Sequence, residues 1–536
     1  MAPRSRLDSR FLAGGVVIVV ASFLLRLYGI GSQAIWTDEA FSWYAATTQE
    51  LRHILLIDDS PPLYYLLLRA WLSLVGTTEA TLRFPSAIAG TCFVATVLWT
   101  GLEIFNARVA LWSGAVAALA PIHIYYSQEA RAYACLVFFL LVSQTLVWRA
   151  LRTNSWSGWM LASLSMLVAF YTHYFAALGL LSGVCLLWVS GERSYWRRYL
   201  AAALASALGF LPWVVWGFGV TARSGAAQDW IRPIWENIPP SMAIPRTLEL
   251  FAIGGQAGLG PIFLKQFTTL EFPPALRVLG LTVLAILAFW VCAPWGDRAV
   301  GIKRLGERKA WLAITLALPL AVLWVVSFFL RPLYLPGRYD LVAFPAFPLI
   351  VGLALAKTQR AVPAGSIVAA VIALLLSVPI GSKLLRYYQA VPQFNYADAT
   401  ARVLDAEVAN GDVVVFTGLR GLPTVYYLSR LGYQWDDRAH RVDRSERSFS
   451  CRLYPLESER MPGVVDARRI LAAPDAVRTD VQAYLSTLSS PGGSVWVVMT
   501  STHAEEGSRL LQELSRQGWA PLSVYRLLGI YRFTRT

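Results

Sequence analysis

Residues 105–134, FNARVALWSGAVAALAPIHIYYSQEARAYA, place a long apolar run before the short polar turn YSQEARAY, and a second apolar run follows that turn. A bilayer span needs about 20 mostly apolar residues. Two such runs joined by a few polar residues are typical of consecutive transmembrane helices. The stretch therefore predicts a membrane protein built from helices.

The composition extends this prediction to most of the chain. Of the 536 residues, 56% are hydrophobic and only 15% are charged, and the mean hydropathy of +0.49 is too apolar for an ordinary soluble domain. The 21 Trp and 23 Tyr exceed what a generic helical bundle needs. Such residues favour membrane interfaces and cavities that hold sugars or lipids.

The formal charge of +14 does not predict nucleic-acid binding, because the basic residues lie in short loops between apolar runs. Four of the five cysteines lie in apolar runs and Cys451 stands alone in the polar tail, so neither a disulfide framework nor a metal-binding pair is predicted. The first apolar run follows three arginines and exceeds signal-peptide length, which predicts a retained first span.

Eleven segments are apolar enough to be spans, namely 11–30, 83–104, 108–126, 131–148, 157–173, 175–190, 199–220, 277–294, 310–330, 339–356 and 363–381. A further segment at 61–76, PPLYYLLLRAWLSLVG, is short and carries Arg69. If the N-terminus is cytoplasmic and this segment does not cross, every strongly basic short loop lies inside, as the positive-inside rule requires. We therefore expect about 11 spans, with 61–76 as an interfacial or re-entrant helix in an outer loop at 31–82.

The polar tail has a different pattern. Helical segments are expected at 396–409, after the strand at 412–416, and at about 504–517. Strands are expected at 412–416, 494–500 and 523–534, with a charged, irregular stretch at 432–465. This alternation predicts a small soluble α/β domain. We expect a transmembrane domain at 1–382 and a non-cytoplasmic, periplasmic domain at 383–536.

Several polar elements are expected on the outer face, and each alone has an ordinary structural explanation. Asp38 and Glu39, beside Trp36, and the pair Asp58 and Asp59 are also consistent with a solvated acidic loop. Glu129 and Arg131 are equally compatible with an ion pair that closes their turn. His173 ends a span among aromatic residues, where a structural role is common, and Arg331 and Arg338 are also compatible with helix anchors.

Together these elements point to one outer cavity with a candidate base, cations suited to a phosphate, and aromatic walls. Arginine binds phosphate through a fixed fork of donors. In sugar transfer from a polyprenyl phosphate, the leaving phosphate needs charge stabilisation, whereas the acceptor hydroxyl or amine needs a carboxylate to take its proton. One carboxylate and one or two arginines meet both needs.

At these residues the chain resembles the polyprenyl-phosphate-dependent GT-C-fold glycosyltransferases, close to glycosyltransferase family 39, which includes protein O-mannosyltransferases and aminoarabinose transferases. The resemblance rests on WTDEAFS, DDSPPLYYLLLRAW, LRFPSAIAGTCFVATVLWTG, the stretch quoted first, FYTHYFA and LPGRYDLVAFPAFPLIVGLAL, over roughly 30–190 and 331–355. It implies a polytopic all-α GT-C domain with interfacial helices in the first outer loop, which carries the catalytic acid.

Carried over by position, the resemblance implies that Asp38 is the general base and Glu39 its acidic neighbour. Glu129 resembles the second acidic site, so the catalytic candidates are Asp38, Glu39 and Glu129. Arg131 resembles a partner for phosphate or carboxylate. Arg338, with Tyr339, matches a late RY element expected to contact the lipid phosphate. We add three residues as substrate-binding candidates: Trp36, Asp59 and His173.

The chain also departs from the aminoarabinose transferases. Ser60 stands where those enzymes have a lysine, and Phe41 replaces an arginine that can follow their acidic pair. Transfer of aminoarabinose is therefore disfavoured, and Arg131, Arg338 or another residue must hold the phosphate.

The sequence thus predicts an inverting glycosyltransferase of the bacterial inner membrane that moves one sugar from a polyprenyl phosphate to a lipid, glycan or protein on the outer face. No cofactor or metal is expected. A transporter or flippase for a lipid-linked sugar, or a non-catalytic binder of it, remains the alternative. Transporters tend to show internal repeats and broken helices near mid-membrane, and we find no repeat here.

Overall fold

The computed structural model describes residues 9–47, 60–190, 195–224, 235–236, 238–254, 273–294, 297, 305–389, 396–417, 421–436, 441–445, 447–454, 457–458, 461–465, 493–499 and 504–535. The chain forms two compact units. Unit 1 contains Met1–Ser32, Ser60–Gly219 and Gln228–Val391, and unit 2 contains Gln33–Asp59, Val220–Ala227 and Pro392–Thr536. The sequence-based domain boundary at 382/383 stays a prediction.

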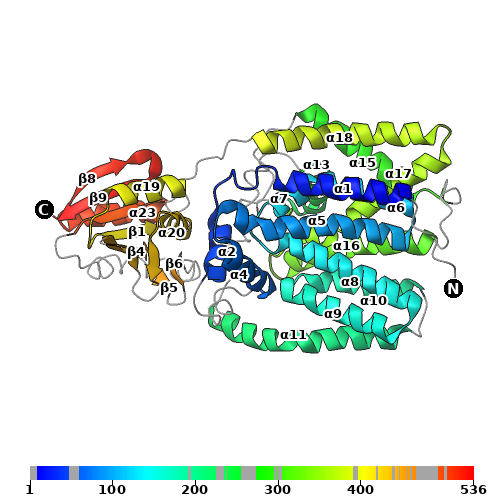
Figure 1. The fold of residues 1–536 in the computed structure, drawn as a ribbon, viewed down its shortest axis with the longest axis horizontal. Helices are drawn as coiled ribbons and strands as arrows, with labels where there is room; N and C mark the ends of the chain where they lie inside the picture. Colours follow the sequence, from blue (N-terminus) through cyan, green and yellow to red (C-terminus); the bar gives the residue numbers. More distant parts are fainter. Residues whose placement is uncertain are drawn as a thin grey trace. The chain divides into compact units, whose positions relative to one another are not determined.

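Unit 1 is helical, and all eleven segments expected as spans coincide with its helices. These are α1 (Ser9–Leu27), α5 (Glu79–Ile104), α6 (Ala107–Leu119) with α7 (Pro121–Ser127), α8 (Tyr133–Thr153), α9 (Trp156–Thr172), α10 (Ala176–Ser190), α11 (Trp196–Ser224), α15 (Pro274–Cys292), α16 (Leu305–Phe329), the 3-10 turn η4 (Tyr339–Ala343) with α17 (Ala346–Ala361), and α18 (Gly365–Gln389). Two further helices are α4 (Leu63–Val75) and α13 (Pro240–Ile253). In Figure 1, α1, α5 and α8 run side by side.

Seven helices of the described part of the chain are long and apolar enough to cross a membrane, or eight if the bent pair α6–α7 counts as one span. Three other expected spans, α9, α10 and α17, are helical but only 15 to 17 residues long. The segment at 61–76 forms α4, a short apolar helix of 13 residues. The prediction of a multi-pass helical membrane protein is confirmed.

The break between α6 and α7 has a local cause. Pro121 is the first residue of α7, and it has no backbone N–H with which to continue the α6 ladder. The residue before a proline is also driven out of the helical region, and Ala120 has the extended values φ −62° and ψ 114°. The two helices therefore meet at an angle of 62°.

Unit 2 contains one helix from the N-terminal part of the chain, α2 (Thr37–Thr47), and the C-terminal α/β fold. Its seven-stranded sheet has the order β2-β3-β4-β1-β7-β9-β8. The strands are β1 (Val413–Thr417), β2 (Gln434–Asp436), β3 (Arg441–Arg444), β4 (Arg447–Tyr454), β7 (Val495–Val498), β8 (Trp519–Tyr525) and β9 (Ile530–Arg535), and β5 (Glu457–Ser458) pairs with β6 (Met461–Val465). The helices are α19 (Tyr396–Glu407), α20 (Gly421–Arg430) and α23 (Ala504–Arg516), with the short turn η6 (Arg526–Leu528).

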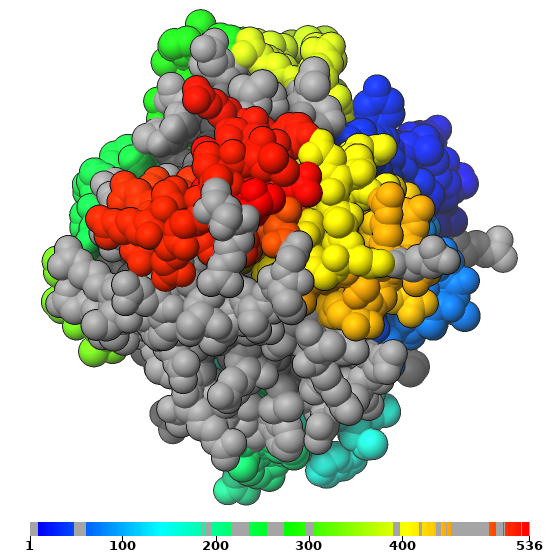
Figure 2. Space-filling view, turned by 90° about the vertical axis from the view of Figure 1, so that its left-hand side faces the viewer, coloured from blue at the N-terminus to red at the C-terminus, as the bar shows by residue number. Residues whose placement is uncertain are grey.

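The central strand β1 pairs in parallel with β4 and β7, and the other pairings of the large sheet are antiparallel. The red C-terminal residues lie beside the yellow α19 in Figure 2, and η6 contacts α19. The predicted α/β fold of the tail is confirmed.

One expectation for the tail is wrong, because the stretch at 432–465 is not irregular. It forms strands β2 to β6. Val442, Phe449 and Cys451 are buried on strands whose other residues include many arginines. Those arginines conceal the alternation of buried and exposed residues that marks a half-buried strand.

Candidate functional site

Arg338 forms the centre of a tyrosine-lined cluster in unit 1. Although charged, it is only 5% exposed. Its Nε donates a hydrogen bond to the Tyr133 hydroxyl, and its guanidinium lies 5.3 Å from the ring centre of Tyr133 and 5.7 Å from that of Tyr339. A cation over aromatic faces gains electrostatic stabilisation, and a guanidinium carries several donors in one plane.

Asp340 stabilises the loop that carries Arg338. This fully buried carboxylate accepts a hydrogen bond of 2.9 Å from the Gly337 N–H and another from the Thr247 hydroxyl of α13. Thr247 in turn shares a 2.7 Å hydrogen bond with Tyr334. Because Asp340 lies two residues from Arg338, it fixes the backbone from which that guanidinium extends.

The turn between α7 and α8 brings Glu129 and Arg131 to the same region. Glu129 is 4% exposed, and both Glu129 and Arg338 act electrostatically on the Tyr126 hydroxyl. Tyr126 donates to the carbonyl of Gly337, and its ring lies 4.9 Å from that of Tyr133. The turn and the Arg338 loop therefore share contacts through tyrosines.

Arg131 is half-buried, and it links the turn to α4 and α5. Its Nη1 donates to the Tyr65 hydroxyl of α4 at 3.1 Å, and its carbonyl accepts from the Ser86 hydroxyl of α5 at 3.2 Å. Within the turn, its N–H donates to the Glu129 carbonyl at 2.8 Å.

His173 borders the cluster at the end of α9. Its ring centre lies 5.7 Å from that of Tyr133, 5.3 Å from Phe175 and 6.1 Å from Tyr339. Its Nδ1 accepts a 3.3 Å hydrogen bond from the Phe175 N–H, so this nitrogen has a structural role at the end of the helix. Of the predicted site residues, the structure thus brings Glu129, Arg131, His173, Arg338 and Tyr339 together.

The remaining predicted residues lie elsewhere in the chain. Trp36, Asp38 and Glu39 belong to unit 2, and Asp59 lies outside the described residues. Asp38 and Glu39 occupy the first turn of α2, where carboxylates are stabilised by the positive end of the helix. Glu39 Oε2 accepts from the Trp36 N–H at 3.4 Å, which is the arrangement by which a glutamate at this position caps a helix start.

Two buried groups of unit 1 were not predicted from the sequence. Asp340 directly follows the RY element. A carboxylate at the start of an apolar run is unusual, and this could have marked it as a candidate in the sequence. Arg26 lies near the end of α1 and is fully buried. It donates to Ser22, Ser127 and the carbonyls of Ala117 and Ala118, across the break between α6 and α7.

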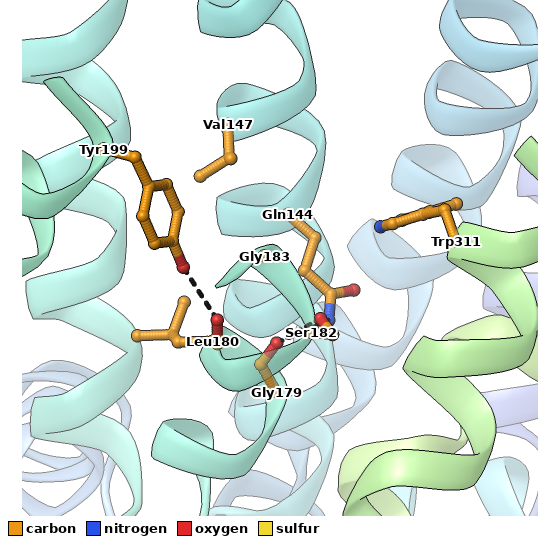
Figure 3. A pocket seen from close by; sticks show the side chains of 8 residues that line it. All are labelled: Gln144, Val147, Gly179, Leu180, Ser182, Gly183, Tyr199 and Trp311. Atoms are coloured by element: carbon orange, nitrogen blue, oxygen red, sulfur yellow. Dashed lines mark hydrogen bonds between the residues drawn. The ribbon is translucent and has the colours of Figure 1, made fainter. Parts of the chain in front are cut away.

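A small pocket lies away from these charges, between α8, α10, α11 and α16 (Figure 3). It is lined by Gln144, Val147, Gly179, Leu180, Ser182, Gly183, Tyr199 and Trp311. The Tyr199 hydroxyl donates to the Leu180 carbonyl at 2.7 Å, and Gln144 Nε2 donates to the Gly179 carbonyl at 3.3 Å. Since its lining contains no charged side chain, we do not assign it a role in phosphate chemistry.

The chain is similar to known proteins in sequence and in fold. Residues 59–216 match the family model described as dolichyl-phosphate-mannose-protein mannosyltransferase. No curated protein matches the sequence. The structure is similar to ArnT from Cupriavidus metallidurans bound to undecaprenyl phosphate, with a TM-score of 0.61 at 13% identity over 98% of both chains.

Two further solved structures are similar. The apo state of the same ArnT has a TM-score of 0.57 at 14% identity, covering 97% of this chain and 98% of that chain. The oligosaccharyltransferase AglB from Archaeoglobus fulgidus, in complex with an inhibitory peptide and a dolichol-phosphate, has a TM-score of 0.52 at 13% identity, covering 99% of this chain and 74% of that chain. The resemblance seen in the sequence is thereby confirmed, and the chain has the GT-C glycosyltransferase fold.

Proposed function

We propose that this protein is an integral-membrane glycosyltransferase that moves a single sugar from a polyprenyl phosphate to a lipid, glycan or protein acceptor on the outer face of the membrane. The GT-C fold and the family match support this class of reaction. The ArnT structure contains undecaprenyl phosphate, and the AglB structure contains a dolichol-phosphate. These two ligands support a polyprenyl-phosphate donor.

The observation that carries the proposal is the burial of Arg338 at the centre of the tyrosine-lined cluster. Placing a cation in low-polarity surroundings costs free energy, so such residues in membrane proteins usually face a substrate or an ion path. We assign the donor phosphate to Arg338, with Arg131 as a second cation. Both are arginines, whose planar fork matches phosphate oxygens.

We assign the general base to Asp38. Glu39 is buried and its carboxylate accepts from the Trp36 N–H, whereas Asp38, at the preceding position of the same helical turn, is half-buried. Asp38 is therefore the member of the pair better suited to meet an acceptor. Glu129, buried in the outer turn, is assigned to orienting the acceptor or donor.

The reaction is a direct displacement at the anomeric carbon. The acceptor hydroxyl or amine attacks this carbon while the bond between the carbon and the phosphate oxygen breaks. Asp38 takes the acceptor proton, and the polyprenyl phosphate leaves with the electron pair of the broken bond. One displacement inverts the anomeric configuration. Because Arg338 and Arg131 would supply the positive charge for the leaving phosphate, we expect transfer to continue in EDTA.

The test is transfer of radiolabelled sugar from a panel of polyprenyl-phosphate donors to envelope acceptors in membranes that contain the wild-type chain, Asp38→Asn or Asp398→Asn. Asp398 lies on α19 and pairs with Arg402 at 3.1 Å, so it serves as a matched control. Label should move with the wild type and the control only. If Asp38→Asn folds and is fully active, Asp38 is not the general base. If the product retains the anomeric configuration, the reaction is not a single displacement.

The same experiment separates the transferase from the transporter alternative. If no donor gives labelled product and the purified chain moves a lipid-linked sugar across a vesicle membrane, the proposed function is wrong.

A further inference from the structure

The acidic helix of the first outer loop packs against a helix of the C-terminal domain. Within unit 2, α2 contacts α20, although the two helices are almost 400 residues apart in sequence. The hydroxyl of Tyr427 on α20 accepts a hydrogen bond of 3.1 Å from the Ile35 N–H, just before α2 begins. The Trp43 ring, further along α2, packs edge to face with the Tyr426 ring, with ring centres 5.4 Å apart at 82°.

These contacts are buried and well defined. Ile35 is 3% exposed and Tyr426 is fully buried, and the two tyrosine rings of α20 pack edge to face with centres 4.9 Å apart. An edge-to-face aromatic pair and a hydrogen bond each favour one orientation more strongly than apolar contact alone. The contact therefore sets the orientation of α2 as well as its position.

The position of the hydrogen bond matters for Asp38. The backbone N–H groups at the entrance to a helix have no partner within the helix. Here the Ile35 N–H is bonded by Tyr427 and the Trp36 N–H by Glu39. Both partners fix the chain at the entrance to α2, and Asp38 follows within the first turn.

The other side of the contact is buried and well packed. α20 directly follows the central strand region and packs on α19, and all eight residues from Gly421 to Leu428 are buried. A buried helix that holds the entrance and the middle of α2 defines where its first turn points.

We propose that the C-terminal α/β domain is the support on which the acidic helix is oriented, and that Tyr427 and Tyr426 are positioning residues for Asp38. This inference rests on the proposed function, since it takes Asp38 as the base. A misplacement of a catalytic group by about 1 Å can lower a rate by as much as ~100-fold. The loss of a single contact that holds α2 should lower kcat by about tenfold and leave the KM for the donor nearly unchanged.

The experiment compares Tyr427→Phe and Trp43→Leu with Tyr433→Phe in the full chain. Tyr433 is a matched control in the same domain, because it is also buried and its hydroxyl donates to Asp405 at 3.0 Å. Hydrogen exchange of peptides covering 35–47 reports on α2 without any need for activity. Steady-state kinetics with the donor identified above gives kcat and KM separately.

We expect Tyr427→Phe and Trp43→Leu to speed exchange of 35–47 and to lower kcat, whereas Tyr433→Phe changes neither. Unchanged exchange in both test variants overturns the inference. It is also overturned if exchange rises but kcat stays at the wild-type value while Asp38→Asn is inactive. If Asp38→Asn itself keeps wild-type activity, the proposed role of the base has failed, and the exchange data then show only a structural contact.

Discussion

Nη2 of Arg26 lies 2.8 Å from Nδ1 of His123, and this contact joins the end of α1 to α7 inside the helical unit. The His123 ring is held between Phe93 and Phe344, with ring centres 4.5 and 5.5 Å away. Arg26 also bonds the carbonyls of Ala117 and Ala118, which the break at Pro121 leaves without helical partners. The arginine thus replaces backbone hydrogen bonds that the bend removes.

Arg26→Met is expected to destabilise the helical unit, because the buried acceptors of α6 and α7 lose their donor. Each buried polar group left without a partner costs on the order of 1–3 kcal/mol, so a total loss of about 3 kcal/mol is expected. Thermal unfolding in detergent measures this loss of stability. Arg10→Met on the exposed start of the same helix is the control. Equal unfolding temperatures for the two variants would show that the network adds no stability.

Gly90→Ala tests the same region through close packing. A Cβ at Gly90 of α5 would overlap the Ser127 side chain and lie 2.9 Å from Arg26 Nε. The substitution should therefore lower the yield of folded protein and shift α7, with reduced transfer. In contrast, Gly381→Ala on α18 meets no atom within 4 Å and should stabilise by up to about 1 kcal/mol through helix propensity. Folded yield by size-exclusion chromatography distinguishes the two, and wild-type behaviour of Gly90→Ala would contradict the packing argument.

Much of the helical unit could be predicted because hydropathy marks each span directly. Arg338 and Tyr339 could be chosen as candidates, since the charge stands in a local motif at the edge of an apolar run, and their role in substrate binding stays a prediction. Arg26 was not, because one arginine inside an apolar segment gives no indication of the carbonyls and the histidine that surround it. Those partners lie about 90 to 100 residues away in sequence.

The contact of α2 with α20 was beyond prediction for the same reason, since it joins Ile35 to Tyr427. The strands at 434–465 were missed because arginines interrupt their apolar alternation. Sequence patterns report local periodicity, whereas these features depend on which distant segments meet.

Glu39 and Asp38 should respond differently to substitution. Glu39→Gln keeps an oxygen that accepts from the Trp36 N–H, whereas Glu39→Ala loses it. Transfer should therefore be near wild type in Glu39→Gln, reduced in Glu39→Ala, and lower by about 100-fold or more in Asp38→Asn, the range expected for loss of a general base. Initial rates of transfer at saturating donor measure the order of activity of the three variants. An inactive Glu39→Gln would show that the charge of Glu39 takes part in the reaction.

Cys451 makes the C-terminal domain sensitive to alkaline pH. Burial raises the pKa of this thiol well above its ordinary value of 9.0. Its contribution to stability is fully present below pH 9.0 and is lost as pH rises further, because the unfolded chain then releases the proton that the folded chain retains. Proteolysis of the C-terminal domain in a urea series at pH 7.5 and pH 10 measures the loss. Cys451→Ala should reduce the difference between the two pH values, and an unaltered difference would refute this origin.

Arg338→Lys tests the assignment of the donor phosphate. A lysine keeps the charge but loses the planar fork and its fit between the rings of Tyr133 and Tyr339. We expect the KM for the polyprenyl-phosphate donor to rise by about tenfold, which corresponds to ~1.4 kcal/mol. Arg331→Lys is a control from the same loop, because Arg331 is exposed. Binding of the sugar-free polyprenyl phosphate, measured by competition, should weaken equally in Arg338→Lys, since the contact is to the phosphate. A variant that loses kcat but binds both lipids normally would instead place Arg338 at the acceptor.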